Sequence, residues 1–338
     1  MILCCGEALM DMLPRTVGTE GTAFLPVPGG AIFNTALALG RLGNRAGFLC
    51  GVSTDLFGEQ LLAHLAASGV TSDLCIRSSR PTTLAFVRLV NGDATYTFYD
   101  ENSAGRLITP GDLPTLPEET RALHFGAISL IGEPCGTAYE ALLTREAPAR
   151  VISLDPNIRP GFITDEAAYR ARLARIIPQA DIIKVSHEDL DWLAPGASFE
   201  TLAGDWLANG AKIVILTLGK DGARALTGCL DVTVPARKVE VVDTVGAGDT
   251  FNAGFLSALD DAGLLGKAAI AAISDQDLAA ALGRAVAVAA ITVSRAGANP
   301  PSEANSLASE TAIAAAKGDS CPKGRLSQLL LQKTLQRT

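Results

Sequence analysis

Asp243-Thr244-Val245-Gly246-Ala247-Gly248-Asp249-Thr250-Phe251-Asn252-Ala253-Gly254 is the stretch that decides the fold of this chain. Its small residues precede a segment with helical periodicity, so the first amides of a helix would lie open to a ligand. The helix dipole adds partial positive charge at the same end, which favours an anion. Asp249 stands where a carboxylate can accept a proton from a hydroxyl. The stretch predicts a phosphoryl-transfer site, and the plain structural alternative is an N-capping aspartate.

A second glycine-containing stretch, Gly29-Gly30-Ala31-Ile32-Phe33-Asn34-Thr35-Ala36, lies far upstream. Gly30 would let a sugar hydroxyl approach the backbone, and the amide of Asn34 offers both a donor and an acceptor to a polyol. The alternative is a glycine turn in which Asn34 satisfies the first turn of an amphipathic helix. Taken with the first stretch, this one predicts a sugar-binding segment.

The two stretches resemble the N-terminal and C-terminal signatures of the PfkB/ribokinase family of carbohydrate kinases, although Ile32-Phe33 stands where the family often has Pro-Ala. The resemblance covers about residues 1–302 and implies one ribokinase-like domain. It also implies that Asp249 is the catalytic base, and that the anion hole for the transferred phosphate is formed by the amides of Gly246, Ala247, Gly248 and Asp249. Residues 303–338, a helix candidate and a basic tail, have no counterpart in the resemblance.

Apolar strand-like runs at 151–155, 182–185 and 213–217 alternate with helical periodicity. This pattern is typical of an α/β protein with a mostly parallel, doubly wound sheet. The predicted helices lie at about 33–43, 57–68, 136–145, 166–178, 199–208, 249–262 and 278–293. Ligands of such sheets bind beyond the carboxyl ends of strands. We therefore expect the chemistry at residues that follow strands, namely Asn157, Arg159, Glu188, Gly219 and Asp249.

Two segments, about 13–28 and 82–100, depart from this alternation. Asn91-Gly92 predicts a hairpin between strands of the second segment, so a small antiparallel sheet is expected beside the main domain. The alternative is an edge extension of the main sheet. In the resembled family this sheet is a lid that covers the sugar and often supplies the dimer contact. The resemblance thus implies a homodimer that associates through the lid.

The resemblance also assigns sugar ligands. Asp11 corresponds to a residue that holds sugar hydroxyls, and Phe98 either packs over the sugar ring or belongs to the lid core. Asp155-Pro156-Asn157-Ile158-Arg159 resembles a segment of fructokinases and ketodeoxygluconate kinases, in which Arg159 would bridge sugar and phosphate or pair with a neighbouring acid. The expected substrate-binding residues are Asp11, Gly29, Gly30, Asn34, Phe98, Asn157, Arg159 and Asp249.

For the nucleotide, Thr217-Leu218-Gly219-Lys220-Asp221-Gly222 resembles the family's glycine-containing loop. The family's Asn-x-x-Glu segment is altered here, because Ser186 replaces the asparagine and either Glu188 or Asp189 supplies the acid that organises water around Mg²⁺. Asp243 and residues 294–300 resemble a monovalent-cation site, which leaves K⁺ open. The expected nucleotide-binding residues are Lys184, Ser186, Thr217, Gly219, Gly222, Ala247, Gly248 and Asn252.

Composition limits the remaining possibilities. With 338 residues and 48% hydrophobic content the chain can bury a large core, and its net charge of −8 argues against nucleic acid as a partner. Seven scattered cysteines, most of them in apolar surroundings, predict reduced core thiols in a cytoplasmic protein. The N-terminus has no basic region before its apolar run, which predicts a buried strand. The most apolar run, 286–293, is shorter than the roughly 20 residues of a membrane-spanning helix, so no membrane partner is expected.

These observations predict an ATP- and Mg²⁺-dependent sugar kinase, with a small-molecule sugar and ATP as its ligands. Gly6-Glu7-Ala8-Leu9-Met10-Asp11-Met12 and Tyr99-Asp100-Glu101-Asn102-Ser103-Ala104 look most like bacterial fructokinases, which implies D-fructose as the sugar. Ketodeoxygluconate kinase and ribokinase are the alternatives. A catalytically silent sugar or nucleotide sensor is an alternative of another class. A dinucleotide-binding oxidoreductase is disfavoured, because Gly6-Glu7-Ala8 does not supply Gly-x-Gly-x-x-Gly.

Overall fold

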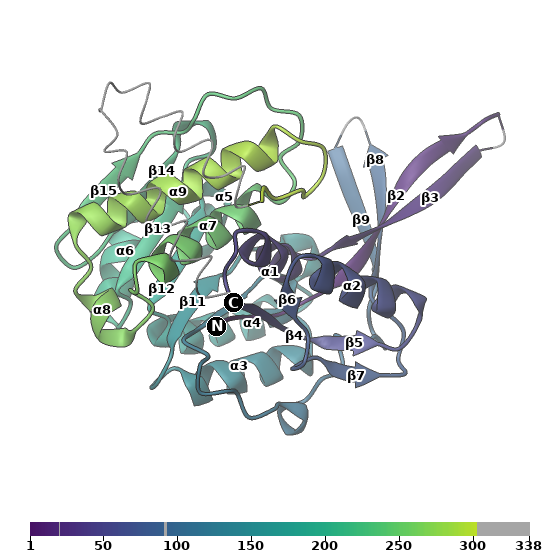
Figure 1. Ribbon diagram of the computed structural model, residues 1–338, viewed down its shortest axis with the longest axis horizontal. Coiled ribbons are helices and arrows are strands. Elements are labelled where there is room, and N and C mark those ends of the chain that lie inside the picture. The colour runs from purple at the N-terminus through teal and green to yellow at the C-terminus, as the bar shows by residue number, and fades with distance from the viewer. Residues whose placement is uncertain (20, 91–92, 303–338) are drawn as a thin grey trace, which may run out of the picture.

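The computed structural model describes residues 1–19, 21–90 and 93–302 (Figure 1). Its main sheet has the strand order β15-β14-β13-β12-β11-β10-β1-β4-β6. Within this order, β6, β4, β1, β10, β11, β12 and β13 pair in parallel, each with the next in this run. Strands β14 and β15 add an antiparallel edge. This confirms the predicted mostly parallel sheet. Its strands are β1 (Ile2–Cys5), β4 (Ala46–Leu49), β6 (Val70–Thr71), β10 (Ala122–Gly126), β11 (Val151–Asp155), β12 (Ile182–Ser186), β13 (Ile213–Thr217), β14 (Ala223–Leu226) and β15 (Asp231–Val234).

Helices cover both faces of this sheet (Figure 1). Side chains of a strand alternate between its faces, so Ile2 and Cys4 pack on one side and Leu3 and Cys5 on the other. The first side is covered by α1 (Ala31–Arg41), α2 (Leu56–Ala67), α7 (Ala247–Asp261), α8 (Lys267–Ala271) and α9 (Asp275–Val293). The second is covered by α3 (Cys135–Glu146), α4 (Glu166–Ile176), α5 (His187–Leu193) and α6 (Phe199–Ala208).

A separate four-stranded sheet projects from the main body (Figure 1), so the alternative of an edge extension is wrong. Its strands are β2 (Leu9–Val17), β3 (Gly21–Gly29), β8 (Leu84–Val90) and β9 (Asp93–Tyr99), in the order β3-β2-β8-β9. We call this sheet the lid. It is not purely antiparallel as expected, because β2 and β8 enter it in the same direction and pair in parallel. Asn91 and Gly92 lie outside the described residues, but the antiparallel pairing of β8 with β9 fits the predicted hairpin. A further two-stranded sheet pairs β5 (Gly51–Ser53) with β7 (Ile76–Ser78).

Helix α9 corrects one expectation from the sequence. It has 19 residues, and an 18-residue window of it has a mean hydropathy of 1.4, so by length and composition it could cross a membrane; the run considered from the sequence was too short. Half of this stretch is buried in the fold, where Leu278, Leu282 and Val286 join the core beside α7. This burial is typical of a core helix.

The cysteines partly follow the prediction. Six lie among the described residues and all six are free thiols. Cys4, Cys5, Cys50 and Cys135 are buried, whereas Cys229 is exposed and so is no core residue. Cys321 and the predicted helix and tail at 303–338 lie outside the described residues.

Candidate active site

The site is built around the start of α7. Gly246 precedes the helix with φ 78°, a left-handed conformation that favours glycine, and a Cβ there would lie 2.8 Å from Ala298 Cβ. The amide of Ala247 donates to Thr244 O at 3.3 Å, so this predicted anion-hole donor is partly engaged. Within the described part of the chain, the amides of Gly246, Gly248 and Asp249 have no acceptor. Of the four predicted anion-hole amides, these three are available to an anion.

The prediction that Asp249 directly follows a strand is wrong. The 235–246 loop separates it from β15. It lies in the first turn of α7, and its side chain is 8% exposed. Asn34 Nδ2 donates to Asp249 Oδ2 at 2.9 Å, and Thr35 Oγ1 donates to Asp249 O at 3.1 Å. The two glycine-containing stretches are therefore in direct contact, through α1 and α7.

Burial raises the pKa of Asp249 to about 6. The Asn34 hydrogen bond opposes this rise, the charge of Asp155 adds to it, and the cations of Lys184 and Arg159 oppose it. A carboxylate tuned towards neutral pH accepts a proton more readily than an ordinary aspartate. Asp249 therefore has the protonation chemistry of a general base.

A buried ion pair lies behind the start of α7. Lys184 Nζ donates to Asp155 Oδ2 at 3.0 Å, and Asn252 Nδ2 donates to the same oxygen at 2.7 Å. Burial alone would lower the pKa of Lys184, but the charges of Asp155 and Asp189 raise it, so the amine stays protonated. A Cβ on Gly248 would lie 3.2 Å from Lys184 Nζ. The absence of a side chain at Gly248 thus lets a buried cation stand close to the free amides.

The predicted sugar residues of the first strands share one corner. Burial raises the pKa of Asp11, on β2, to about 6. A Cβ on Gly29 would lie 2.2 Å from Asp11 Oδ2, so the glycine makes room for this carboxylate. Gly30 has φ 112°, and a Cβ there would lie 2.8 Å from Glu7 O. Glycine is needed at this position because a side chain would collide with the backbone oxygen of Glu7. The sequence did not indicate this reason.

The lid meets the loop after β11 at an aromatic contact. The rings of Phe98 and Phe162 have centroids 4.0 Å apart. This contact supports the interpretation that Phe98 belongs to the core of the lid. Asn157 adopts φ 41°, and its amide donates to Asp155 Oδ1 at 3.1 Å. Arg159 is exposed, and its guanidinium donates to Ile158 O at 3.0 Å, so the alternative of an acidic structural partner finds no support among the described residues. Arg159 remains available to a ligand.

We expect Gly29→Ala to raise the KM for sugar about tenfold, with kcat little changed, because the new methyl group displaces the Asp11 carboxylate. A hydrogen bond to a charged group contributes about 1.5–3 kcal/mol, and about 1.4 kcal/mol corresponds to a tenfold change. Steady-state kinetics with varied sugar measure the effect. Gly228→Ala is the matched control, since a Cβ at Gly228 meets nothing within 4 Å. An unchanged KM in Gly29→Ala would contradict the placement of Asp11 at the sugar.

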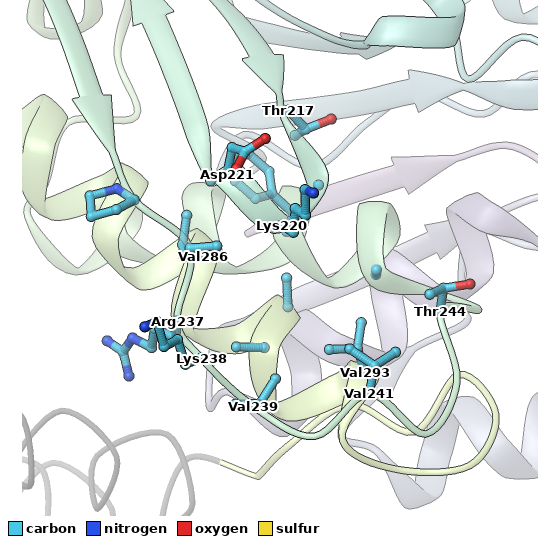
Figure 2. Close-up of a pocket in the computed structure, with 18 of the residues that line it drawn as sticks. Thr217, Lys220, Asp221, Arg237, Lys238, Val239, Val241, Thr244, Val286 and Val293 are labelled. Atoms are coloured by element: carbon cyan, nitrogen blue, oxygen red, sulfur yellow. The ribbon is translucent and has the colours of Figure 1, made fainter.

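A cavity of about 770 Å³ lies beside the start of α7 (Figure 2). This volume lies within the range of about 300–1,000 Å³ that ligand pockets occupy. Its walls come from the β13–β14 turn, the 235–244 loop, α7 and α9. Of the predicted nucleotide residues it is lined by Thr217, Gly219, Gly222, Ala247 and Gly248. Gly248, whose amide is free, therefore belongs to the wall of the cavity.

Three predicted nucleotide residues lie outside the lining of this cavity. Lys184 and Asn252 belong to the buried network at Asp155, and Ser186 caps α5 by accepting from Asp189 N at 3.1 Å. Sequence reasoning assigned no role to Lys220, Asp221, Val239 and Val293, which do line it. The apolar wall from α9 could not be inferred, because the helical pattern shows which residues are apolar and not which face a cavity.

The structure separates the two acids proposed for the metal. Asp189 is buried and accepts hydrogen bonds from Ser186 N, Ser186 Oγ and Ile158 N, at 2.7–2.8 Å. Glu188 is exposed, so its carboxylate is the one open to water. Among the described residues, no group of three His, Cys, Asp or Glu side chains could hold a metal ion. The residues present fit a metal held mainly by nucleotide phosphates and water, as Mg²⁺ commonly is.

Asp243 joins two loops. Its Oδ1 accepts from Val245 N at 3.0 Å, and its Oδ2 accepts from Gly297 N at 2.9 Å. Both of its carboxylate oxygens therefore already hold backbone amides. Asp243 lies next to residues 294–300, as the resemblance implies.

A lid beside a mostly parallel sheet, a cavity large enough for a nucleotide and a buried carboxylate at a helix start agree with the carbohydrate kinase expected from the sequence. The protein-family model for pfkB family carbohydrate kinases matches residues 1–305. The chain belongs to this family.

Relatives with known names agree with this assignment. The chain is 56% identical over 280 residues to a fructokinase from Rhizobium leguminosarum bv. trifolii, covering 82% of this chain and 85% of the relative. The structure matches a fructokinase from Xylella fastidiosa with bound ATP at a TM-score of 0.85 and 28% identity, over 93% of this chain and 98% of the other. It matches a fructokinase from Vibrio cholerae O395, in a form that binds fructose, ADP and calcium ion, at a TM-score of 0.77 and 26% identity, over 91% and 97% of the two chains.

Proposed function

We propose that this carbohydrate kinase transfers the γ-phosphoryl group of ATP to the primary hydroxyl of D-fructose, giving fructose 6-phosphate and ADP. The named relatives support the choice of reaction and sugar. The observation that carries the chemistry is the start of α7, where the buried carboxylate of Asp249 belongs to the same helical turn as free backbone amides, beside the cavity.

In the proposed mechanism, Phe98 closes the lid side of the sugar site. The sugar is surrounded by Asp11, Gly29, Gly30, Asn34, Asn157 and Arg159. Asp249 accepts the proton of the primary hydroxyl. The oxygen forms a bond to the γ-phosphorus as the bond between that phosphorus and the β–γ bridging oxygen breaks, and ADP leaves with the electron pair. The amides of Gly248 and Asp249 and the ammonium of Lys184 face the charge on the transferred group. Positioning and charge stabilisation carry such reactions.

Cation requirements form a separate part of the proposal. Glu188 would hold waters of a nucleotide-bound Mg²⁺, which would neutralise phosphate charge when present. Asp189, which three donors already satisfy, would only fix the start of α5. K⁺ at Asp243 would be coordinated by carboxylate and backbone oxygens of the two joined loops. Assays with Mg²⁺ removed, and with K⁺ replaced by tetramethylammonium, test the two ions separately.

One ion pair favours fructose over ketodeoxygluconate. A sugar acid needs a cation for its carboxylate, and Arg106 lies near the base of the lid. Its guanidinium instead contacts Asp100 Oδ2 at 2.6 Å and Glu133 O at 2.7 Å. Arg106 is therefore already neutralised and is not free to pair with a sugar carboxylate.

ADP release measured in parallel with D-fructose, ketodeoxygluconate, D-ribose and no sugar tests the substrate. We expect the highest kcat/KM with D-fructose. A preference for ketodeoxygluconate or D-ribose would overturn the sugar and leave the reaction class standing. ADP release with none of them would overturn the proposal in favour of a sensor or of another acceptor.

We expect kcat/KM for fructose to fall with decreasing pH, with an apparent pKa of about 6. The pKa of Asp249 is raised to about 6, so the base is protonated below this pH and ionised above it. Initial rates between pH 5 and 8, with enzyme integrity checked at each pH, give the profile. A rate that stays constant down to pH 5 would exclude a base with this pKa.

The lid also supports a proposed homodimer. Val17, Phe24, Leu25, Tyr96 and Tyr99 are large apolar or aromatic side chains that are 42–59% exposed on it. Phe24 and Leu25 are consecutive on β3, so these exposed side chains lie on both faces of the lid, and exposed apolar residues in this number favour a protein contact. We expect sedimentation to give twice the mass of the chain and Leu25→Asp to give a monomer; a monomeric wild type would contradict this.

We further propose a cytoplasmic location, which fits the free thiols of the described cysteines.

A further inference from the structure

Glu7 is a carboxylate that the mechanism does not use, although it lies at a junction of the site. It follows β1, and Glu7 Oε1 accepts from Ala31 N at 2.9 Å and from Ile32 N at 3.4 Å. Glu7 Oε2 accepts from Ser129 N at 3.3 Å, in the 3₁₀ turn η2 (Ala127–Leu130). One side chain therefore ties the start of α1 to the ends of two central strands.

The helix that Glu7 holds carries the partners of Asp249. Glu7 receives the first amides of α1, and Gly30, which precedes the helix, has no side-chain cap of its own. Asn34, one turn later, donates to Asp249 Oδ2, and Thr35 donates to Asp249 O. Gly30 packs so closely on Glu7 that a Cβ would approach Glu7 O to 2.8 Å. A shift of the α1 start would move Asn34 relative to the base.

We infer that Glu7 is a positioning residue for Asp249, and that it acts through the first turn of α1 and the Asn34 hydrogen bond. This inference rests on the proposed role of Asp249. A substitution that releases α1 weakens the Asn34 hydrogen bond and so favours the protonated form of the base.

The surroundings of Glu7 allow this effect to be measured. Burial raises the pKa of Glu7 to about 7, and the charge of Asp249 adds to the rise. Cys50 and Tyr169 also interact electrostatically with Glu7, and burial raises the pKa of each, so both stay neutral across the assay range. The first turn of α1 contributes no acidic residue. The Asn34 hydrogen bond acts on Asp249 more strongly than the charge of Glu7 does.

The experiment compares Glu7→Ala, Asn34→Ala and the double variant across pH. In each single variant we expect kcat to fall about tenfold, as for the loss of one hydrogen bond to a charged group, and the acid limb of kcat/KM to move to higher pH. The double variant should match Asn34→Ala within about twofold, because both changes remove the same interaction. Glu7→Gln should stay close to wild type, because its amide oxygen still accepts from Ala31. Losses that multiply in the double variant would overturn the inference.

Two further variants guard against a purely structural effect. Glu7→Asp keeps the charge but cannot reach α1, so it should show the losses in kcat and the shift of the acid limb expected for Glu7→Ala. It also keeps the experiment possible if Glu7→Ala fails to fold. Asp165→Ala is the matched control, since Asp165 Oδ1 accepts from Ala168 N at 2.9 Å at the start of α4, a helix without site residues. It should leave the acid limb unmoved. A limb that moves to lower pH in Glu7→Gln would show that Glu7 acts by charge alone and would overturn the positioning role.

The wild-type rate in the same assay tests the proposed function separately. The carboxyl pKa of Asp249, measured by ¹³C NMR in wild type and Glu7→Asp, needs no turnover. A higher Asp249 pKa in Glu7→Asp supports the inference even if fructose is not the substrate. An unchanged pKa would overturn it even in an active kinase.

Discussion

Asp249→Asn should lower kcat with D-fructose by about 10³-fold, while KM for fructose and ATP changes by less than about threefold. General-base catalysis contributes about 10²–10⁴-fold, and an amide cannot accept the hydroxyl proton. Asparagine keeps the size of the side chain and an oxygen for the Asn34 hydrogen bond, so binding and fold should persist. Initial-rate kinetics and thermal unfolding measure the two effects.

Asp261→Asn provides the control for this variant. Asp261 lies at the last turn of the same helix, 43% exposed, where it pairs with Arg284. The identical substitution there should leave kcat unchanged. If Asp249→Asn keeps wild-type turnover, Asp249 is not the base, and its contact with Asn34 is structural.

Lys184→Met should have two separable effects. The variant leaves Asp155 as a buried charge without its cation, which costs about 3–5 kcal/mol in the free energy of unfolding when a buried pair loses one partner. It also removes positive charge close to the Gly248 amide, which should lower kcat about a hundredfold, as for one donor of an oxyanion hole. Denaturant unfolding and steady-state kinetics measure them.

The double variant Lys184→Met with Asp155→Asn separates stability from catalysis. It removes both charges, so we expect most of the stability to return while kcat stays low. Lys267→Met is the control pair, because Lys267 Nζ contacts Asp181 Oδ2 at 2.6 Å, outside the lining of the nucleotide cavity. It should lose stability without losing kcat. Recovery of kcat in the double variant would show that Lys184 serves only to neutralise Asp155.

Much of this fold could be predicted because parallel strands buried on both faces are continuous apolar runs. The runs at 151–155 and 213–217 match β11 and β13, and the predicted helix at 199–208 matches α6. The parallel pairing of β2 with β8 could not be predicted, since strand order depends on contacts between distant segments. The loop before α7 was missed, because the sequence placed Asp249 directly after a strand, whereas residues 235–246 form a loop between β15 and α7.

The site shows the same division between local and distant information. Local glycine patterns predicted the start of α7 and the segment that carries Asn34, but not that Asn34 would contact Asp249. Asp155 and Glu7 were quoted only as members of motifs. Their roles depend on Lys184, Asn252 and Ala31, which are remote in sequence. No periodicity of a single segment reports such contacts.

The most direct measurement is the yield of sugar phosphate against ADP with Mg²⁺, ATP and D-fructose, read by ³¹P NMR and a coupled ADP assay on the same sample. We expect one fructose 6-phosphate for each ADP and no ADP without fructose. Fructose binding without ADP formation would identify a sensor. ADP formed at the same rate without fructose would show that water, and not the sugar hydroxyl, receives the phosphoryl group, which contradicts the role proposed for Asp249.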